Sequence, residues 1–134
     1  MLTVKTYLSP SKIEGLGLFA GEDIKKDDVT WKYTPGFDLE YSQEELEKMP
    51  EMLQDYIKTY AALSMVSNKY ILGSDDVKFT NHSPDPNLES VQIEGEREKI
   101  ARAKKDIRKG EEMTIDYRGF DKNDAVSDKK YSRQ

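Results

Sequence analysis

Short runs of alternating apolar and polar residues, each ended by turn-forming residues, restrict the fold of this chain more than any other feature. Such a run puts its apolar side chains on one face of a β-strand. The alternation extends from Leu2 to Leu8, and residues 9–11 (SPS) then interrupt it. Alternation also covers residues 29–33, 91–93 and 113–117, while residues 16–20 form a short apolar run and residues 100–103 a further expected strand. We therefore expect a mainly β fold built from several small sheets.

The middle of the chain changes to a helical pattern. Ser42 and Glu45 have the spacing of a capping box, which begins a helix. Pro50 ends that helix, because proline lacks a backbone N–H, and a second helix is expected from about Glu51. Its apolar residues are three or four positions apart: Leu53, Tyr56, Ile57 and Tyr60. The sequence thus predicts a small helical insertion over about residues 38–63.

The composition limits the number of domains and the chemistry. With 134 residues, the chain suits one domain, which we expect over residues 1–120, followed by a polar tail over 121–134. It has no cysteine and one histidine, which excludes a disulfide framework, a cysteine zinc site and an iron–sulfur cluster. A run of about 18 apolar residues and a signal-peptide pattern are both missing. We therefore expect a cytoplasmic protein without a membrane partner.

The charge of the chain is unevenly distributed. The formal net charge of −5 argues against direct nucleic-acid binding, because nucleic acids select basic surfaces. Seven acidic residues and a single lysine lie between Asp38 and Asp55. This stretch is compatible with an ordinary solvated helix face, or with a surface that attracts a basic polypeptide.

Two segments of the chain resemble one another. Residues 22–30 and 105–114 each place an isoleucine, Ile24 or Ile107, before a basic turn that leads into a strand. A repeat architecture needs at least about three copies. We therefore interpret the pair as one hairpin pattern used twice.

Three segments differ from ordinary scaffold. Residues 15–17 (GLG) allow a tight turn or the close approach of a ligand, but lack the length of a nucleotide-binding loop. Residues 79–87 (FTNHSPDPN) combine two prolines with hydrogen-bonding side chains. Residues 110–117 (GEEMTIDY) are expected to form a strand that ends at Tyr117, with the odd-numbered residues on one face.

Each segment has a simpler interpretation as well. A lone histidine such as His82 is more often structural than catalytic. Ser83 and Asp85 lie too close to it in the chain for the geometry of a catalytic triad. The acidic residues of the third segment could bind a divalent metal or could be turn charges, and we favour the turn. They are Glu111, Glu112 and Asp116.

The three segments together are more specific than any one of them. EGLGLFA, FTNHSPDPN and ARAKKDIRKGEEMTIDY, in this order, resemble the SET-domain lysine methyltransferases, in particular their minimal bacterial and viral members. The resemblance covers about residues 2–120. It implies a β-clip-like fold of small sheets, whose C-terminal pseudoknot brings residues 81–82 against the strand that ends at Tyr117.

The resemblance also implies an active site without a metal. S-adenosylmethionine would bind on one face and leave as S-adenosylhomocysteine, and Tyr117 takes the position of the catalytic tyrosine. The cofactor-binding residues would be Gly15, Leu16, Gly17, Asn81 and His82. A channel from the other face would admit the substrate lysine, with a wall drawn from Ile115, Phe120, Tyr60 and Tyr70. For these two wall tyrosines, packing in the core is an equal alternative.

Methyl transfer to lysine places two demands on such a channel. The amine must be neutral, and burial in an apolar channel lowers its pKa from the usual value of about 10.4. The hydroxyl of Tyr117 would then orient the amine. Ile115 stands where many relatives carry Phe or Tyr, so we expect room for more than one methyl group.

The implied function is methylation of lysine in a histone-like or other basic protein. The helical insertion is a candidate surface for pairing two copies, and a host nucleus is an alternative location if the protein is viral or an effector. The alternative function is a SET-like module that binds a peptide or protein without catalysis. The intact glycines, Asn81, His82 and Tyr117 argue against that alternative.

Overall fold

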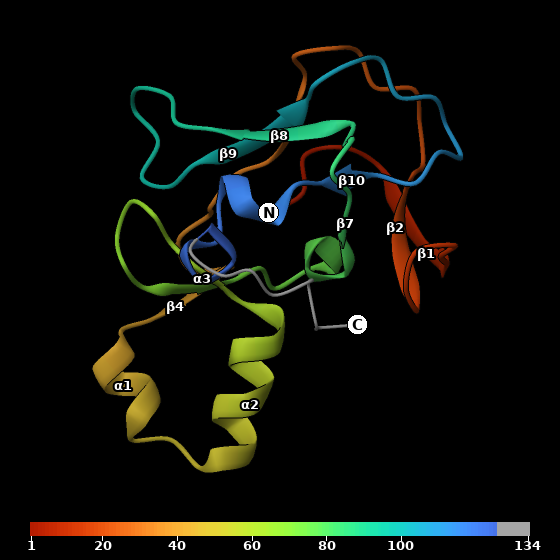
Figure 1. Cartoon of the computed structure of the whole chain (residues 1–134). Coiled ribbons are helices and arrows are strands. Elements are labelled where there is room, and N and C mark those ends of the chain that lie inside the picture. The colour runs from red at the N-terminus through yellow and green to blue at the C-terminus, as the bar shows by residue number, and fades with distance from the viewer. Residues whose placement is uncertain (126–134) are drawn as a thin grey trace.

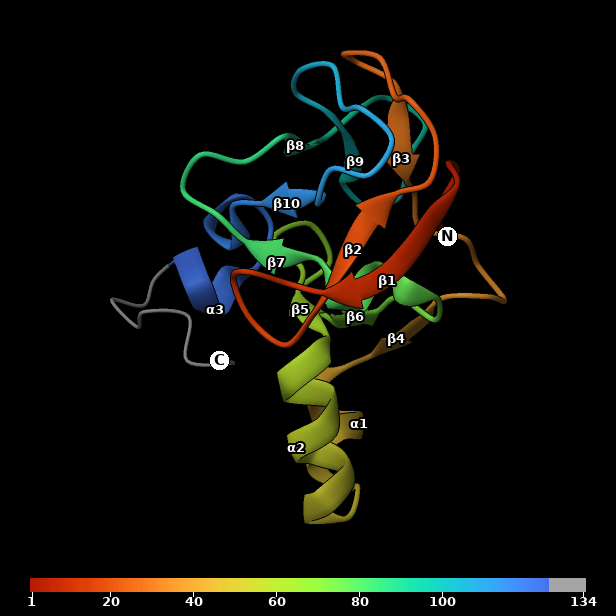
Figure 2. The ribbon, with the colours of Figure 1, turned by 90° about the vertical axis from the view of Figure 1, so that its right-hand side faces the viewer.

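Small sheets and one projecting pair of helices make up the structure, a computed structural model that describes residues 1–125 (Figure 1). The helices α1 (Gln43–Glu47) and α2 (Glu51–Tyr60) extend together from one end of the β-rich part (Figure 2). The expectation of a mainly β fold with a small helical insertion is therefore confirmed.

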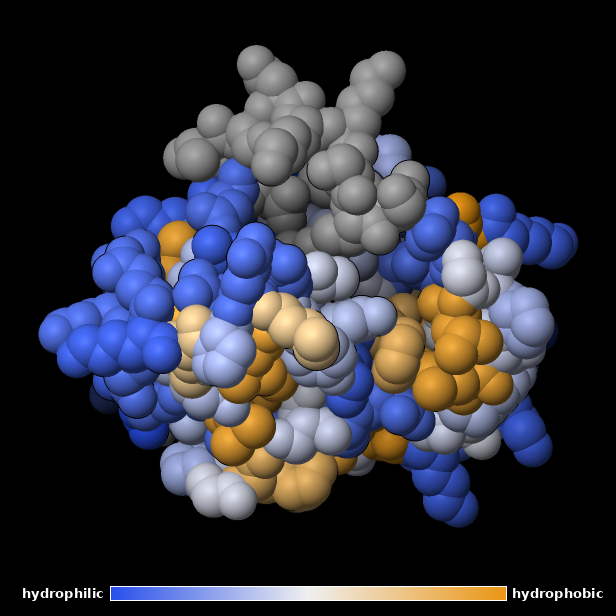
Figure 3. Space-filling model, turned by 90° about the horizontal axis from the view of Figure 1, so that it is seen from below, coloured by the Kyte–Doolittle hydropathy of each residue, from blue (hydrophilic) through white to orange (hydrophobic). Residues whose placement is uncertain are grey.

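The two helices of the insertion begin as the sequence predicts. The Ser42 hydroxyl accepts the Glu45 N–H, the Glu45 carboxylate accepts the Ser42 N–H, and both bonds measure 3.0 Å. Helix α2 follows Pro50, buries Ile57 and leaves Met52 84% exposed. Seen from below, the molecule shows its apolar residues in separate patches among hydrophilic ones (Figure 3). Within residues 1–125, the side of α2 that carries Ile57 is thus covered and the side that carries Met52 is not.

A two-stranded hairpin carries the glycine-rich segment. Strands β1 (Thr6–Pro10) and β2 (Leu16–Ala20) are antiparallel. The expected interruption at residues 9–11 is partly wrong, because Ser9 and Pro10 continue β1, as a proline can at the end of an edge strand. The start of the chain is not part of this strand, since Leu2 forms a separate bridge with Trp31.

Two further sheets are three-stranded and antiparallel. In one sheet the order is β3 (Val29–Trp31), β9 (Ile100–Ala103) and β8 (Leu88–Val91). In the other the order is β4 (Leu39–Tyr41), β6 (Tyr70–Leu72) and β5 (Ala62–Leu63). Tyr33 and Ile93, which belong to predicted alternating runs, lie outside the strands.

The two similar segments of the sequence pair with each other. Ile24 and Ile107 exchange two backbone hydrogen bonds, each of 2.8 Å. The Asp106 carboxylate accepts the Lys26 N–H, and the Asp23 carboxylate accepts the Lys109 N–H, at 2.9 Å in both cases. The two copies of the hairpin pattern therefore lie side by side and bind each other.

The fourth and shortest sheet of the described residues joins two segments that are far apart in the sequence. Strands β7 (Asn81–His82) and β10 (Thr114–Ile115) are parallel, with His82 opposite Ile115. The prediction of a long final strand is wrong, because the chain turns into the 3₁₀ helix η2 (Tyr117–Gly119). The Asp116 carboxylate caps this helix by accepting the Arg118 N–H. A second 3₁₀ helix, η1 (Asp76–Phe79), precedes β7.

The buried apolar residues form two clusters. The larger cluster lies among the sheets and contains Leu18, Ala20, Ile24, Leu88, Ala103, Ile107, Met113, Ile115 and Tyr117. The smaller cluster lies at the base of the helices and contains Leu46, Ile57, Ala61, Leu63, Tyr70 and Leu72. Candidate site residues therefore fall into both clusters.

The first residues of the predicted tail are held against the fold. Asp121 is buried, and its carboxylate accepts the Leu63 N–H at 3.2 Å. Helix α3 (Lys122–Ala125) follows it. The rest of the predicted tail, residues 126–134, lies outside the described residues. Within residues 1–125, the helices are too short or too polar to cross a membrane.

Candidate functional site

Tyr117 and His82 meet where β7 pairs with β10. Nδ1 of His82 accepts the backbone N–H of Tyr117 at 3.1 Å, and the two rings lie 5.2 Å apart between centroids. The Ile115 carbonyl accepts the Ser83 N–H at 3.0 Å and extends the pairing by one bond. The two motifs are thus brought together, as the sequence predicts.

The Tyr117 hydroxyl has a defined direction. It donates a hydrogen bond of 2.7 Å to the backbone carbonyl of Thr80, and the side chain is almost wholly buried. The ring of Phe120 meets the Tyr117 ring edge-on at 5.9 Å. Three aromatic rings, those of His82, Tyr117 and Phe120, therefore adjoin one another.

Asn81 holds the glycine-rich loop in place. Its side-chain amide nitrogen donates to the carbonyls of Glu14 (3.0 Å) and Leu16 (3.3 Å), and to the carboxylate of Glu112 (2.9 Å). Gly15 adopts a positive φ of +43°, a conformation that side chains disfavour. The sequence predicts that Asn81 binds the cofactor, whereas in this structure its amide nitrogen is committed to the loop.

Two residues to which the sequence analysis assigned no site role complete this arrangement. The carboxylate of Glu112, which the sequence predicts to be a turn charge, also accepts the Ser11 hydroxyl at 2.8 Å. The side-chain oxygen of Asn87 accepts the Thr114 N–H, and its amide nitrogen donates to the Glu112 carbonyl, both at 2.8 Å. Asn87 is the last residue of the segment 79–87. Its side-chain amide can both donate and accept a hydrogen bond, and this property is the feature of the sequence that could have indicated its role.

Burial and the neighbouring charges shift the pKa of His82. Burial lowers the pKa of His82, the Asp116 carboxylate 3.8 Å away raises it, and Arg118 lowers it; the net direction is downward. The pKa of Asp116 is lowered mainly by its hydrogen bond with the Arg118 guanidinium. A neutral imidazole is consistent with Nδ1 acting as an acceptor.

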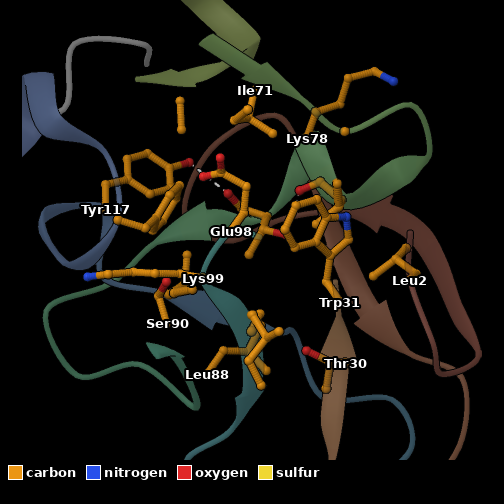
Figure 4. A pocket seen from close by; sticks show the side chains of 18 of the residues that line it. Leu2, Thr30, Trp31, Ile71, Lys78, Leu88, Ser90, Glu98, Lys99 and Tyr117 are labelled. Atoms are coloured by element: carbon orange, nitrogen blue, oxygen red, sulfur yellow. Dashed lines mark hydrogen bonds between the residues drawn. The ribbon is translucent and has the colours of Figure 1, made fainter. Parts of the chain in front are cut away.

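A cavity of about 140 Å³ lies beside Tyr117. Its wall includes three of the four predicted channel residues, namely Ile115, Phe120 and Tyr60. Tyr70 packs in the smaller apolar cluster instead, because β6 is the central strand of its sheet. Figure 4 shows Tyr117 and Glu98 pointing into the cavity from different elements.

The acidic and histidine side chains are the candidates for binding a metal ion. No group of three or more such residues that could hold a metal ion is found in residues 1–125. Glu112 and Asp116 instead have separate structural partners, a serine and asparagine for the first and an arginine for the second. Glu112, which the sequence predicts to be a turn charge, therefore has a further role, because it binds both Ser11 and Asn81.

Comparison with known proteins gives a consistent result. A family model described as the SET domain matches residues 15–118. The Schizosaccharomyces pombe protein named histone-lysine N-methyltransferase, H3 lysine-4 specific, is 28% identical over 134 residues, which are 90% of this chain and 13% of that protein. Histone-lysine N-methyltransferase trr of Drosophila melanogaster is 32% identical over 120 residues, which are 88% of this chain and 5% of that protein. The chain thus spans a small part of these relatives.

Solved structures share the fold. A Plasmodium falciparum protein described as a candidate histone methyltransferase superposes with a TM-score of 0.61 at 25% identity, covering 87% of this chain and 95% of that one. A humanized mutant of the Chaetomium thermophilum Polycomb Repressive Complex 2 gives a TM-score of 0.64 at 23% identity, covering 87% of this chain and 15% of that one. The second likeness concerns the fold alone.

Proposed function

This chain belongs to the SET-domain family, and we propose that it transfers a methyl group from S-adenosylmethionine to the side-chain amine of lysine in a protein. The names of its relatives as histone-lysine methyltransferases support the reaction class. Because the chain spans little of those relatives, the proposal depends mainly on the site. We propose that residues 1–120 act as a single catalytic domain.

The position of the Tyr117 hydroxyl carries the proposal. Its O–H group donates to the Thr80 carbonyl, and this bond fixes the direction of the hydroxyl. The residue also lines the cavity. An oxygen in this position can accept an N–H of an amine, or a C–H of a polarised methyl group. It would orient the nucleophile, which contributes a large part of the rate in displacement reactions.

The surroundings of the glycine-rich loop suit the cofactor. Leu16 is apolar yet 47% exposed, and the space next to Gly15 is open. Adjoining aromatic rings attract a cation such as a sulfonium. The residues proposed to hold the cofactor are Gly15, Leu16, Gly17, Asn81 and His82. When bound, S-adenosylmethionine supplies a methyl group attached to positively charged sulfur.

The cavity wall suits an alkyl chain that ends in an amine. Ile115, Phe120 and Tyr60 contribute apolar surface, which favours the neutral form of a buried amine. The acidic stretch between Asp38 and Asp55 adds negative charge near the helical insertion. We therefore propose a basic protein, of histone type or otherwise, as the substrate.

The test is transfer from radiolabelled S-adenosylmethionine to a panel of basic proteins. Tyr117→Phe should reduce the rate by at least about a hundredfold, while calorimetry shows that the cofactor still binds. Tyr7→Phe, on the exposed side of β1, is the matched control and should leave the rate unchanged. Equal rates for wild type and Tyr117→Phe would contradict the proposal. Peptide binding without any transfer would favour the non-catalytic module.

A further inference from the structure

Glu98 is a buried carboxylate in the cavity that contains Tyr117. It lies just before β9, is only 6% exposed and lines the cavity wall. In Figure 4 its carboxylate and the Tyr117 side chain point toward one another across this space. Glutamate is rarely buried to this extent unless it is paired, because an isolated charge loses its hydration. The groups that contact this carboxylate therefore indicate what it can bind.

The hydrogen bonds of Ser64 define the state of one carboxylate oxygen. The Ser64 hydroxyl oxygen accepts the N–H groups of Val66 and Ser67, each at 3.0 Å. Because a hydroxyl oxygen has two acceptor positions, its own proton is left for Oε1 of Glu98, to which it is hydrogen-bonded. The second oxygen, Oε2, is buried and has no hydrogen-bond partner in the described part of the chain.

The cations of the cavity wall do not neutralise this oxygen. The ammonium groups of Lys99 and Lys78 donate instead to backbone carbonyls, at 3.0 and 3.1 Å. Within residues 1–125 no ion pair includes Glu98. Trp31 Nε1 is another buried wall atom without a partner in that range, but it is a donor and cannot receive a cation. Among the buried side-chain atoms of residues 1–125 that line the cavity, the acceptor without a hydrogen-bond partner is thus a carboxylate oxygen.

We propose that Glu98 binds the ε-ammonium group of the substrate lysine and accepts its proton. This inference rests on the proposed function. One N–H bond of the ammonium breaks, the proton bonds to Oε2, and the electron pair remains on nitrogen as the neutral nucleophile. The proton leaves for water before the next substrate binds, which restores the carboxylate. The Ser64 hydroxyl holds Oε1, so that Oε2 faces the amine.

The first test measures binding without catalysis. n-Butylammonium chloride, which represents the lysine side chain, and uncharged n-butanol are titrated separately, and the methyl signals of Leu88 and Ile100 in the cavity wall are followed by NMR. Wild type should bind the ammonium at least about tenfold more tightly than the alcohol. Glu98→Gln keeps the size and the acceptor for Ser64, and should abolish this preference. Glu94→Gln, in the exposed part of the same loop, should retain it.

The second test uses the pH profile of methyl transfer. Only about one lysine in 2,500 is neutral at pH 7, so a variant without the proton acceptor depends on that small fraction. Glu98→Gln should lower kcat/KM at least about tenfold at pH 7, and the deficit should shrink as the pH rises toward about 9. The titratable or charged groups around Glu98 are Tyr33, Tyr60, Lys78, Arg97, Lys99 and Tyr117.

The outcomes separate the two proposals. Equal affinity of wild type and Glu98→Gln for butylammonium overturns the role of Glu98, whether or not transfer occurs. A rate deficit that does not change with pH overturns its role as proton acceptor. A wild-type protein that prefers the ammonium but transfers no methyl group supports the ammonium site and contradicts the proposed function.

Discussion

The backbone N–H of Tyr117 donates a hydrogen bond of 3.1 Å to Nδ1 of His82, 35 positions earlier in the chain. Only an unprotonated Nδ1 can accept this bond. The register of β7 with β10 brings the two residues together. The position of Tyr117 in the cavity therefore depends on a neutral His82.

The first prediction concerns stability at mildly acidic pH. Because burial lowers the pKa of His82, the unfolded chain binds a proton first as the pH falls below about 6.5. The free energy of unfolding should therefore decrease as the pH falls below about 6.5, by up to about 1 kcal/mol, the usual contribution of a hydrogen bond. Urea unfolding at a series of pH values measures this change.

His82→Asn is the control for this prediction. It replaces the sole histidine with a side chain that does not titrate but can still offer an acceptor oxygen. The decrease should disappear in this variant. The same decrease in both proteins would show that another group is responsible.

A second prediction concerns the amide of Asn81. In this structure the Asn81 amide nitrogen lies 2.9 Å from a carboxylate oxygen of Glu112. Asn81→Asp removes this donor and places a second carboxylate against that of Glu112. The variant should lose about 2–4 kcal/mol of stability, more than Asn81→Ala, because it adds charge repulsion to the lost hydrogen bonds. Adding Glu112→Gln to Asn81→Asp should restore part of the loss in urea unfolding. Independent effects of the two substitutions would contradict the contact.

A third prediction compares two glycines. A Cβ at Gly17 would overlap the Glu112 carboxylate, reaching its Cδ at 2.8 Å, and Ser11 and Asn81 prevent that carboxylate from moving freely. Gly17→Ala should therefore lower the free energy of unfolding by about 1–3 kcal/mol. Gly119→Ala meets nothing within 4 Å and should change it by less than about 0.5 kcal/mol. Equal losses of unfolding free energy in the two variants would show that the Glu112 side chain can move away from the added methyl group.

The fourth prediction follows from the proposed function and concerns the number of methyl groups. Ile115 is buried and lines the cavity beside Tyr117. Ile115→Phe should fill part of this space and shift the products toward monomethyl-lysine in mass spectrometry. Ile115→Val, which adds no volume, should leave the product distribution unchanged. The larger side chain should also destabilise the fold by about 1–3 kcal/mol, so thermal unfolding is measured in parallel.

Local features of the sequence were sufficient for several elements. The capping box at Ser42 and Glu45 and the helix after Pro50 depend on neighbouring residues, and both are present as predicted. The strand after Gly15 likewise follows from a short local run of apolar residues. The final strand was predicted too long, because the cap at Asp116 turns the chain into η2 and overrides the alternation.

The mainly β fold could be predicted from the sequence, because strands depend on the pattern of neighbouring residues. The family could be predicted as well, because its three motifs occur in a fixed order along the chain. The pairing of Ile24 with Ile107 could not, since similar segments need not touch. Nor could the commitment of Asn81 to the glycine-rich loop, or the unsatisfied oxygen of Glu98 beside Tyr117. Hydrogen-bond partners and burial are properties of atoms a few ångströms apart in space, and folding joins them from distant positions along the chain.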